Sequence, residues 1–239
     1  MATALPSCAI LLLLAGTFGC SSSELLLPEP PGAEIVALSK FEGDNQEGTV
    51  GEQLPAPLVV RVVTVQRDQP ATGRTVEFVT TAGSVELGRA TAVTDSEGKA
   101  TWRAVLGTAP GDYVIQARLL EEEGEPQIQE FIARAKPGQP DTLSTASPVS
   151  QPGRRGQDIT PPPLVRIVDR FGNPVPDIQV AWQVISGNGE ISEPITRTGD
   201  AGTATVNWRL GDRPGVHKLT ATIERATGSP ATFTATVLF

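Results

Sequence analysis

The sequence predicts an all-β protein made of two tandem β-sandwich domains. Val, Thr, Gly and Pro recur at short intervals, aromatic residues make up only 5% of the chain, and helix-favouring runs are hard to find. The length of 239 residues fits two domains of about 100 residues each. An internal repeat covers nearly everything after residue 34, so the same fold is expected twice.

Residues 1–19 have the pattern of a cleavable signal peptide. Residues 9–15 form a short apolar run, Ala-Ile-Leu-Leu-Leu-Leu-Ala, which is too short to cross a bilayer as a helix. Cys20 follows Gly19 and precedes three serines. This arrangement resembles a bacterial lipoprotein signal, and the resemblance implies that Cys20 becomes the lipidated first residue of the mature chain.

Two alternatives to lipidation remain open at this point. Thr17 and Phe18 stand where lipoprotein signals carry a Leu-like residue and a small residue, and no Lys or Arg precedes the apolar run. Ordinary cleavage near Gly19 would leave Cys20 as a free thiol, whereas an uncleaved segment would act as an anchor. Lipidation and ordinary cleavage both export the protein.

The mature chain would keep at most one cysteine, because Cys8 lies inside the predicted signal. No internal disulfide is then expected, and the sandwiches must be held together by core packing. Residues 20–33 follow as a short tether, in which the prolines remove amide donors and prevent regular strand pairing.

Charge is distributed unevenly along the chain, whose net charge is −8. Residues 34–136 carry 16 acidic and 10 basic residues, whereas residues 141–239 carry 9 of each. No cluster of Lys or Arg occurs beyond the pair Arg154-Arg155, so nucleic acid is not expected as a partner.

The two halves of the chain align at a constant offset of 104 residues. Between residues 98–117 and 202–221, 8 of 20 positions are identical. Residues 137–140, Pro-Gly-Gln-Pro, interrupt any strand and are the predicted linker between domain one, residues 34–136, and domain two, residues 141–239. A linker this short and rich in proline is expected to restrict rotation, which suits a spacer.

Period-two alternation of apolar and polar residues predicts the strands. The last segment, residues 231–239, alternates throughout, and its odd-numbered residues are expected to face the core. The other predicted strands are residues 58–65, 75–80, 99–105, 113–119, 128–135, 165–169, 178–184, 204–210 and 217–223. Asp95 with Gly98, and Asp200 with Gly202, predict turns in which an Asp side chain caps backbone amides.

Four aromatic residues are predicted core positions: Phe78, Trp102, Trp182 and Trp208. Trp102 and Ala104 lie two apart on one predicted strand, and the repeat aligns them with Val206 and Trp208. The bulky aromatic has changed places between the repeats, which conserves the total volume on a shared inner face.

The second repeat carries the pattern Asp-x-x-Gly-x-Pro-Val, then Val-x-Trp, then Gly-x-Ala-x-x-x-Trp-x-Leu-Gly, then Pro-Gly. Its residues are Asp169, Gly172, Pro174, Val175, Val180, Trp182, Gly202, Ala204, Trp208, Leu210, Gly211, Pro214 and Gly215. This pattern resembles the bacterial immunoglobulin-like (Ig-like) repeats of the invasin and intimin type, the group one bacterial Ig-like domains. The resemblance implies two Ig-like β-sandwiches.

In that family such domains are mostly extracellular spacers in adhesins, and binding is assigned to terminal lectin-like domains that this sequence does not contain. The first repeat departs from the pattern, because Thr64, Arg67 and Gln69 stand where Asp, Gly and Pro are expected. Ala104 also stands where Trp is expected, so the first loop is expected to differ in shape.

No catalytic, cofactor-binding or metal-binding residues are predicted. His217 is the one histidine and lacks a second histidine or cysteine for a metal or a catalytic triad, so a structural role is expected. Glu121–Glu123 with Glu125 form an acidic loop tip, which more simply solvates a hairpin than binds calcium. Gly187–Gly189 is expected to be a turn. The protein is therefore not expected to be an enzyme.

The leading hypothesis is a non-catalytic cell-envelope protein whose Ig-like domains form a spacer or a protein-interaction module, held at the membrane by a lipid on Cys20. The alternative is a glycan- or protein-binding module that acts through the loop tips of one domain, with the acidic first domain as the better candidate. The protein is expected at the outer membrane or cell surface, or else secreted or periplasmic.

Overall fold

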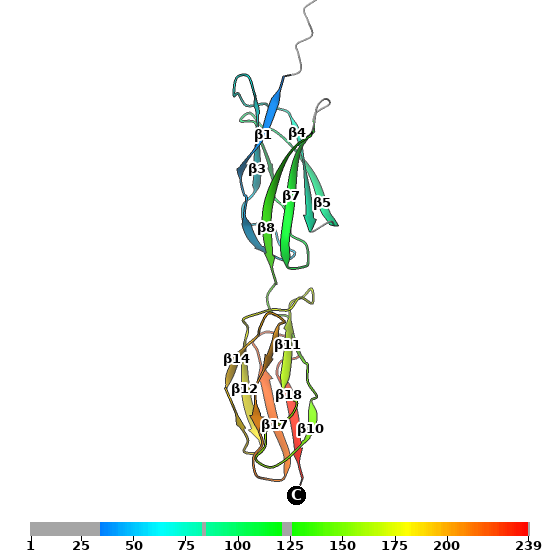
Figure 1. Ribbon diagram of the computed structural model, residues 1–239, viewed down its shortest axis with the longest axis vertical. Helices are drawn as coiled ribbons and strands as arrows, with labels where there is room; N and C mark the ends of the chain where they lie inside the picture. The colour runs from blue at the N-terminus through cyan, green and yellow to red at the C-terminus, as the bar shows by residue number, and fades with distance from the viewer. Residues whose placement is uncertain (1–33, 83–84, 121–125, 239) are drawn as a thin grey trace, which may run out of the picture. The chain divides into compact units, whose positions relative to one another are not determined.

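The computed structural model describes residues 34–82, 85–120 and 126–238, and all regular elements in these ranges are β-strands. The strands form two sets whose members pair only within their own set. The first set is β1 (Val36–Glu42), β2 (Gln46–Thr49), β3 (Leu58–Thr64), β4 (Thr75–Ala82), β5 (Val85–Val93), β6 (Lys99–Trp102), β7 (Gly111–Leu120) and β8 (Gln127–Lys136). The second set is β9 (Thr142–Thr145), β10 (Ser150–Gly153), β11 (Leu164–Val168), β12 (Gln179–Ser186), β13 (Glu190–Ile191), β14 (Ile195–Arg197), β15 (Thr203–Thr205), β16 (Trp208–Arg209), β17 (Gly215–Thr222) and β18 (Ala231–Val237). The predicted all-β fold with two tandem sandwiches is confirmed (Figure 1).

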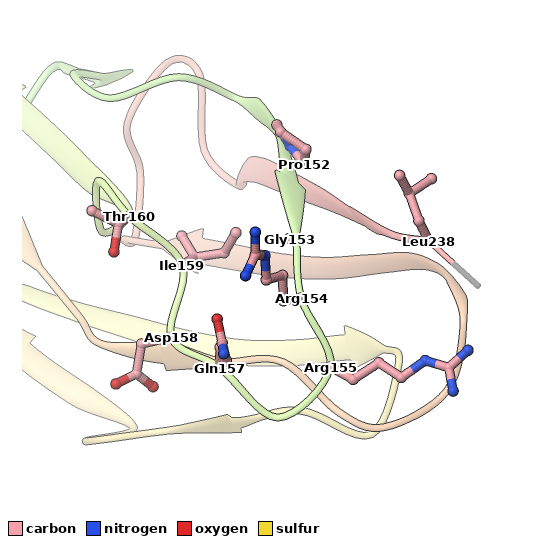
Figure 2. A pocket seen from close by; sticks show the side chains of 9 residues that line it. All are labelled: Pro152, Gly153, Arg154, Arg155, Gln157, Asp158, Ile159, Thr160 and Leu238. Atoms are coloured by element: carbon pink, nitrogen blue, oxygen red, sulfur yellow. The ribbon is translucent and has the colours of Figure 1, made fainter.

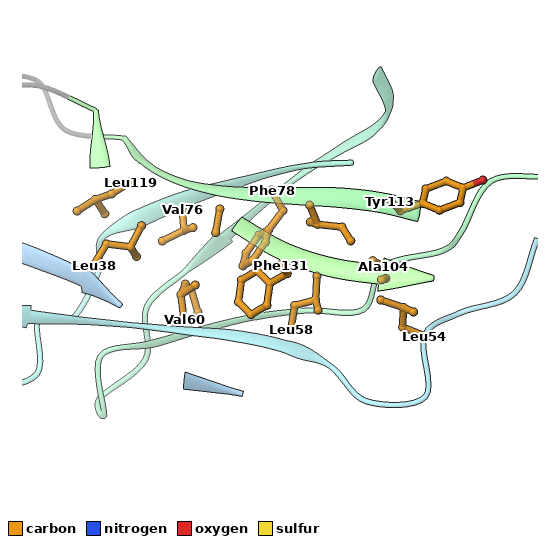
Figure 3. Packing of buried hydrophobic residues seen from close by; sticks show 14 of the residues in the cluster. Leu38, Leu54, Leu58, Val60, Val76, Phe78, Ala104, Tyr113, Leu119 and Phe131 are labelled. Atoms are coloured by element: carbon orange, nitrogen blue, oxygen red, sulfur yellow. The ribbon is translucent and has the colours of Figure 1, made fainter. Parts of the chain in front are cut away.

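The first sandwich packs the sheet β1-β3-β6 against the sheet β2-β8-β7-β4-β5. β3 reads Leu-Val-Val-Arg-Val-Val-Thr, and its branched side chains favour an extended strand with a buried inner face. Leu58 and Val60 of this strand belong to one buried cluster with Phe78 from β4 and Phe131 from β8 (Figure 3). Apolar side chains from both sheets therefore fill the space between them without any disulfide.

The second sandwich is built from the sheets β15-β11-β9 and β10-β18-β17-β12-β14, with the short pair β13-β16 beside them. Trp182 on β12 packs against Phe233 on β18, with 6.2 Å between the ring centroids. Both side chains belong to a buried cluster that is separate from the cluster of the first sandwich. Each sandwich thus has its own hydrophobic core.

In both sandwiches the first part of the chain changes sheets. β1 pairs antiparallel with β3, and β2 then pairs parallel with β8, the last strand of its set. β9 and β10 repeat this arrangement with β11 and β18. In the first sandwich, the Asp44 carboxylate stabilises the crossing, because it accepts hydrogen bonds from the Lys40 side chain and the Ile132 amide. The repeat seen in the sequence is therefore also a repeat of topology.

The last strand has the predicted orientation, because Ala231, Phe233, Ala235 and Val237 are all buried. Two predicted strands differ from the structure. The strand expected over residues 99–105 ends as β6 at Trp102, and the one expected over 204–210 is divided into β15 and β16. The chain changes partners there, since β15 pairs with β11 and β16 with β13.

The loop after β3 corrects one residue of the expected alignment. Pro70 forms a bridge with Val63, as Pro174 does with Val168 in the second domain. Pro70, and not Gln69, therefore occupies the position of Pro174. The bridged residues are seven apart in the first domain (70 − 63) and six apart in the second (174 − 168), so the first loop contains one extra residue, and the offset between the domains changes from 105 at Val168 to 104 at Pro174.

Candidate functional site

Two groups of predicted residues lie outside the described part of the chain. One is Cys20, with the signal and tether around it. The other is the acidic loop tip formed by Glu121–Glu123 and Glu125. Both remain predictions from sequence.

Three of the four predicted core aromatics are buried inside the sandwiches, and the fourth is partly buried. Phe78, Trp182 and Trp208 are buried, whereas Trp102 is half-buried, with its ring centroid 5.6 Å from that of Phe78. The indole Nε1–H of Trp182 donates a hydrogen bond to Thr196 Oγ1 at 2.8 Å. The Trp208 indole nitrogen has no hydrogen-bond partner among the described residues.

His217 lies on β17 and is buried, with 1% of its surface exposed. Its Nε2 lies 2.8 Å from the carbonyl oxygen of Arg213 and therefore donates the proton of that bond. The ring packs against Gly187, where an added Cβ would lie 2.2 Å from His217 Cγ and where φ is +101°. Only glycine fits this turn, and the histidine is part of the packing beneath it.

Asp169 begins the loop that carries the family pattern, and only 2% of its surface is exposed. Its carboxylate accepts hydrogen bonds from the backbone amides of Phe171, Asn173 and Gly138, each at 2.9 Å, and from the Asn173 side-chain amide. Burial alone would raise the pKa of Asp169, but the hydrogen bonds from Asn173, Gly138 and Phe171 outweigh it, so the pKa lies below its ordinary value. The ionised side chain therefore organises this loop.

The ionisable side chains of the described residues do not converge on a reaction centre. Within these ranges there is no group of three or more His, Cys, Asp or Glu side chains placed to hold a metal ion. Exposed ion pairs are scattered, for example Arg197 with Asp177 at 2.9 Å and Lys99 with Glu97 at 2.7 Å. No helix in the described chain is long and apolar enough to span a membrane.

The outer face of β7 and β8 in the acidic first domain, here called the β7–β8 face, exposes apolar side chains on a regular strand. Ile128 and Ile132 are 44% and 51% exposed, and Ile132 lies opposite Val114 of β7. Between the two isoleucines, Glu130 accepts a hydrogen bond from the Gln116 side chain at 2.8 Å. The face thus mixes apolar and charged groups, as protein-binding surfaces do. The sequence prediction pointed to loop tips and missed it.

Two of the open cavities lie on the second domain. One, of 550 Å³, crosses the outer face of β12 beside Ala181 and Ile195. The other, of 820 Å³, lies beside the segment 153–159 that follows β10, and Arg154 and Arg155 line it (Figure 2). The sequence singled out this pair of arginines, but it contained no signal for a cavity.

Comparison with known proteins supports the fold of the second domain directly. Residues 163–236 match the family model described as Bacterial Ig-like domain (group 1). The match starts beside β11 and ends within β18. The resemblance to bacterial Ig-like repeats of the invasin and intimin type is thereby confirmed. No curated protein matches this sequence.

Solved structures share the fold at low sequence identity. The Escherichia coli adhesin FdeC is 16% identical, with 84% of this chain and 62% of FdeC covered and a TM-score of 0.51. The adhesin InvE of Yersinia pseudotuberculosis is 17% identical, with 88% and 62% covered and a TM-score of 0.39. Invasin, described as a bacterial integrin-binding protein, is 21% identical, with 85% and 39% covered and a TM-score of 0.38. The chain spans less than two thirds of each of these proteins, and the likeness concerns the fold alone.

Proposed function

We propose that this chain is an exported, non-catalytic cell-envelope protein whose two Ig-like domains serve as a spacer or interaction module. The observation that carries the proposal is the direction of the chain through each domain. β2 runs parallel to β8, and β10 runs parallel to β18. The first segment and the last strand of each domain therefore point the same way, so the chain enters at one end of the sandwich and leaves at the other.

A domain that the chain enters at one end and leaves at the other increases the distance that the chain can span. The ten residues of β8 extend about 33 Å at the rise of a β-strand. The match of residues 163–236 to bacterial Ig-like domains supports the same role, and two of the similar solved structures are named as adhesins. Adhesion by this chain itself is part of the proposal.

Attachment to the membrane is proposed to occur through a lipid on Cys20. The proline-containing tether of residues 20–33 would connect this anchor to the first domain. The lipid and the tether together would place the sandwiches outside the membrane, in the envelope or at the cell surface.

The anchor is tested by expressing the full chain in a bacterium that processes lipoproteins and separating membrane from soluble protein. The wild-type chain is expected in the membrane fraction, and a Cys20→Ala chain in the soluble fraction. Cys8→Ala is the matched control, because it removes the other cysteine and leaves the predicted lipidation site intact. Membrane partitioning that is unchanged in Cys20→Ala would reject the anchor.

A second candidate function is protein or glycan binding by the first domain, and the β7–β8 face favours it over the loop tips. Ile132 is half exposed on a rigid strand, where a partner can bury it without ordering a loop. A glycan array and a panel of envelope proteins are probed with the full chain, with Ile132→Lys and with Ile185→Lys, which alters an equally exposed residue on β12. Binding that only Ile132→Lys abolishes supports this function, and an absence of binding by the wild-type chain rejects it.

A further inference from the structure

The segment 153–159, here called the Arg loop, begins where the pairing of β10 with β18 ends, and it is hydrogen-bonded to residues 208–210 of the same sandwich. It passes through Arg154 and Arg155, turns at Gly156 with a φ of +64°, and returns to the core at Ile159, which is buried. The cavity of 820 Å³ lies along this loop and extends to Leu238, just after β18. Figure 2 shows the Arg154 side chain beside Ile159, and Arg155 extending from the turn.

The first domain contains an equivalent segment that differs in the burial of its side chains. An added Cβ on Gly48 would lie 2.7 Å from Leu106 Cδ1, and one on Gly153 would lie 2.1 Å from Leu210 Cδ1. Both glycines also sit on the strand that pairs parallel with the last strand of their domain. Gly48 and Gly153 are therefore structurally equivalent.

This equivalence aligns Thr49 with Arg154 and Val50 with Arg155. Val50 is 1% exposed and belongs to the core of the first domain. Its amide donates a hydrogen bond to the carbonyl oxygen of Lys136 at 3.0 Å, which keeps the segment against the end of β8. In the second domain both positions are exposed arginines, and the cavity lies beside them.

The two arginines are not explained by the packing of the domain. Among the described residues, neither guanidinium has a hydrogen-bond or ion-pair partner, although other arginines of the second domain, such as Arg197, are paired. Among the described residues that line the cavity, Asp158 supplies the one carboxylate against these two cations. Its apolar wall is formed by Ile159, Pro152 and Leu238.

We propose that the Arg loop binds a phosphate group, either free or carried by a lipid headgroup. Each guanidinium offers five N–H donors in a fixed fork that matches the oxygens of phosphate. The residues are consecutive, although Figure 2 shows their side chains extending in different directions, and phosphate has more oxygens than a carboxylate and carries up to two charges that two cations can balance. The exposed Leu238 beside them suits the apolar part of a lipid.

The test uses the full chain with Cys20→Ser, so that its outcome does not depend on the proposed lipid anchor. Inorganic phosphate is titrated calorimetrically, and the chain is sedimented with phosphatidylcholine vesicles with and without phosphatidic acid. Arg154→Gln with Arg155→Gln removes both cations, and Arg154→Thr with Arg155→Val restores the residues of the first domain. Arg166→Gln with Arg225→Gln is the matched control, because it removes the same charge from two exposed positions of the same domain.

Phosphate binding is expected to weaken about tenfold or more in both Arg-loop variants and to stay within about twofold in the control. Binding of inorganic phosphate alone identifies free phosphate as the source, whereas binding that requires phosphatidic acid identifies a lipid headgroup. Either result supports the proposal if the Arg-loop variants lose it. No binding by the wild-type chain to either probe, or an equal loss in the control, would overturn the proposal.

Discussion

The carboxylate of Asp169 accepts a hydrogen bond from the backbone amide of Gly138 at 2.9 Å, which fixes the linker to a loop 31 residues further along the chain. The same carboxylate accepts hydrogen bonds from the amides of Phe171 and Asn173, also at 2.9 Å. One buried side chain therefore positions both the loop with the family pattern and the chain that enters the second domain.

Replacing Asp169 with Asn is expected to lower the free energy of unfolding of the second domain by about 1–3 kcal/mol. The amide keeps the size of the side chain but replaces one acceptor oxygen with a donor that faces backbone N–H groups. Urea unfolding followed by the fluorescence of Trp182 and Trp208 measures the change. Asp200 is the control, because its exposed side chain does not make the expected cap and has no hydrogen bond among the described residues. Asp200→Asn should change stability by less than about 0.5 kcal/mol, and an equal loss in both variants would contradict this role for Asp169.

The lowered pKa of Asp169 also predicts how this contribution depends on pH. Burial acts to raise the pKa, but the hydrogen bonds to the ionised form prevail, so the folded-state pKa lies below the ordinary value of 3.8. A carboxyl group with a depressed pKa contributes stability above its unfolded-state pKa and loses it as the pH falls through the folded-state value. The difference between wild type and Asp169→Asn should thus be full at about pH 6 and shrink progressively below about pH 4. A pH-independent difference would be inconsistent with this account.

Gly202→Ala is expected to destabilise the second domain by about 3 kcal/mol or more. Gly202 has a φ of +67°, and an added Cβ would lie 2.5 Å from the backbone carbonyl oxygen of Ile167, which cannot move without breaking the sheet. Gly172 is the control, since its φ is +84° but an added Cβ would meet nothing within 4 Å. Gly172→Ala should cost only the backbone strain, about 1–2 kcal/mol. Chemical denaturation of the two variants, compared side by side, checks the order.

Thr198→Val is expected to cost the second domain about 1–3 kcal/mol, although it preserves the shape of the side chain. The buried Thr198 hydroxyl donates to the carbonyl oxygen of Val175 at 2.8 Å and accepts from the amide of Ile178 at 2.9 Å. Thr94 makes the equivalent two bonds in the first domain, so Thr94→Val should cost that domain a similar amount. Thermal unfolding by calorimetry measures both, with the exposed Thr232→Val as the control. A cost no larger than that of the control would show that the hydroxyl bonds contribute nothing.

Strands with one buried face were predictable from the alternation of apolar and polar residues. The presence of the same fold twice was predictable from the internal repeat. β18 was predictable because apolar and polar residues alternate along its whole length. β10 was not, because Ser-Gln-Pro-Gly has no alternation and its proline is tolerated only at the edge of a sheet. β13 is two residues long, which is too short for any periodicity to show.

The exposure of individual side chains depends on where strands end, and the alignment of the two repeats does not predict the strand ends. Trp102 is half-buried at the end of β6, whereas Trp208 is 1% exposed on β16. The cavity beside Arg154 lies at a similar difference, since Arg155 is exposed where the equivalent Val50 of the first domain is buried. Such differences arise from the local backbone conformation at single residues. An alignment of the two repeats does not predict that conformation.

The proposed lipid anchor is tested by the intact mass of the full-length protein expressed in a lipoprotein-processing bacterium and purified from its membranes. We expect a mature chain that begins at Cys20 and carries added acyl mass, which would establish two Ig-like domains tethered to the envelope. An unmodified chain that begins at another residue would contradict the anchor and make the protein a secreted or periplasmic module.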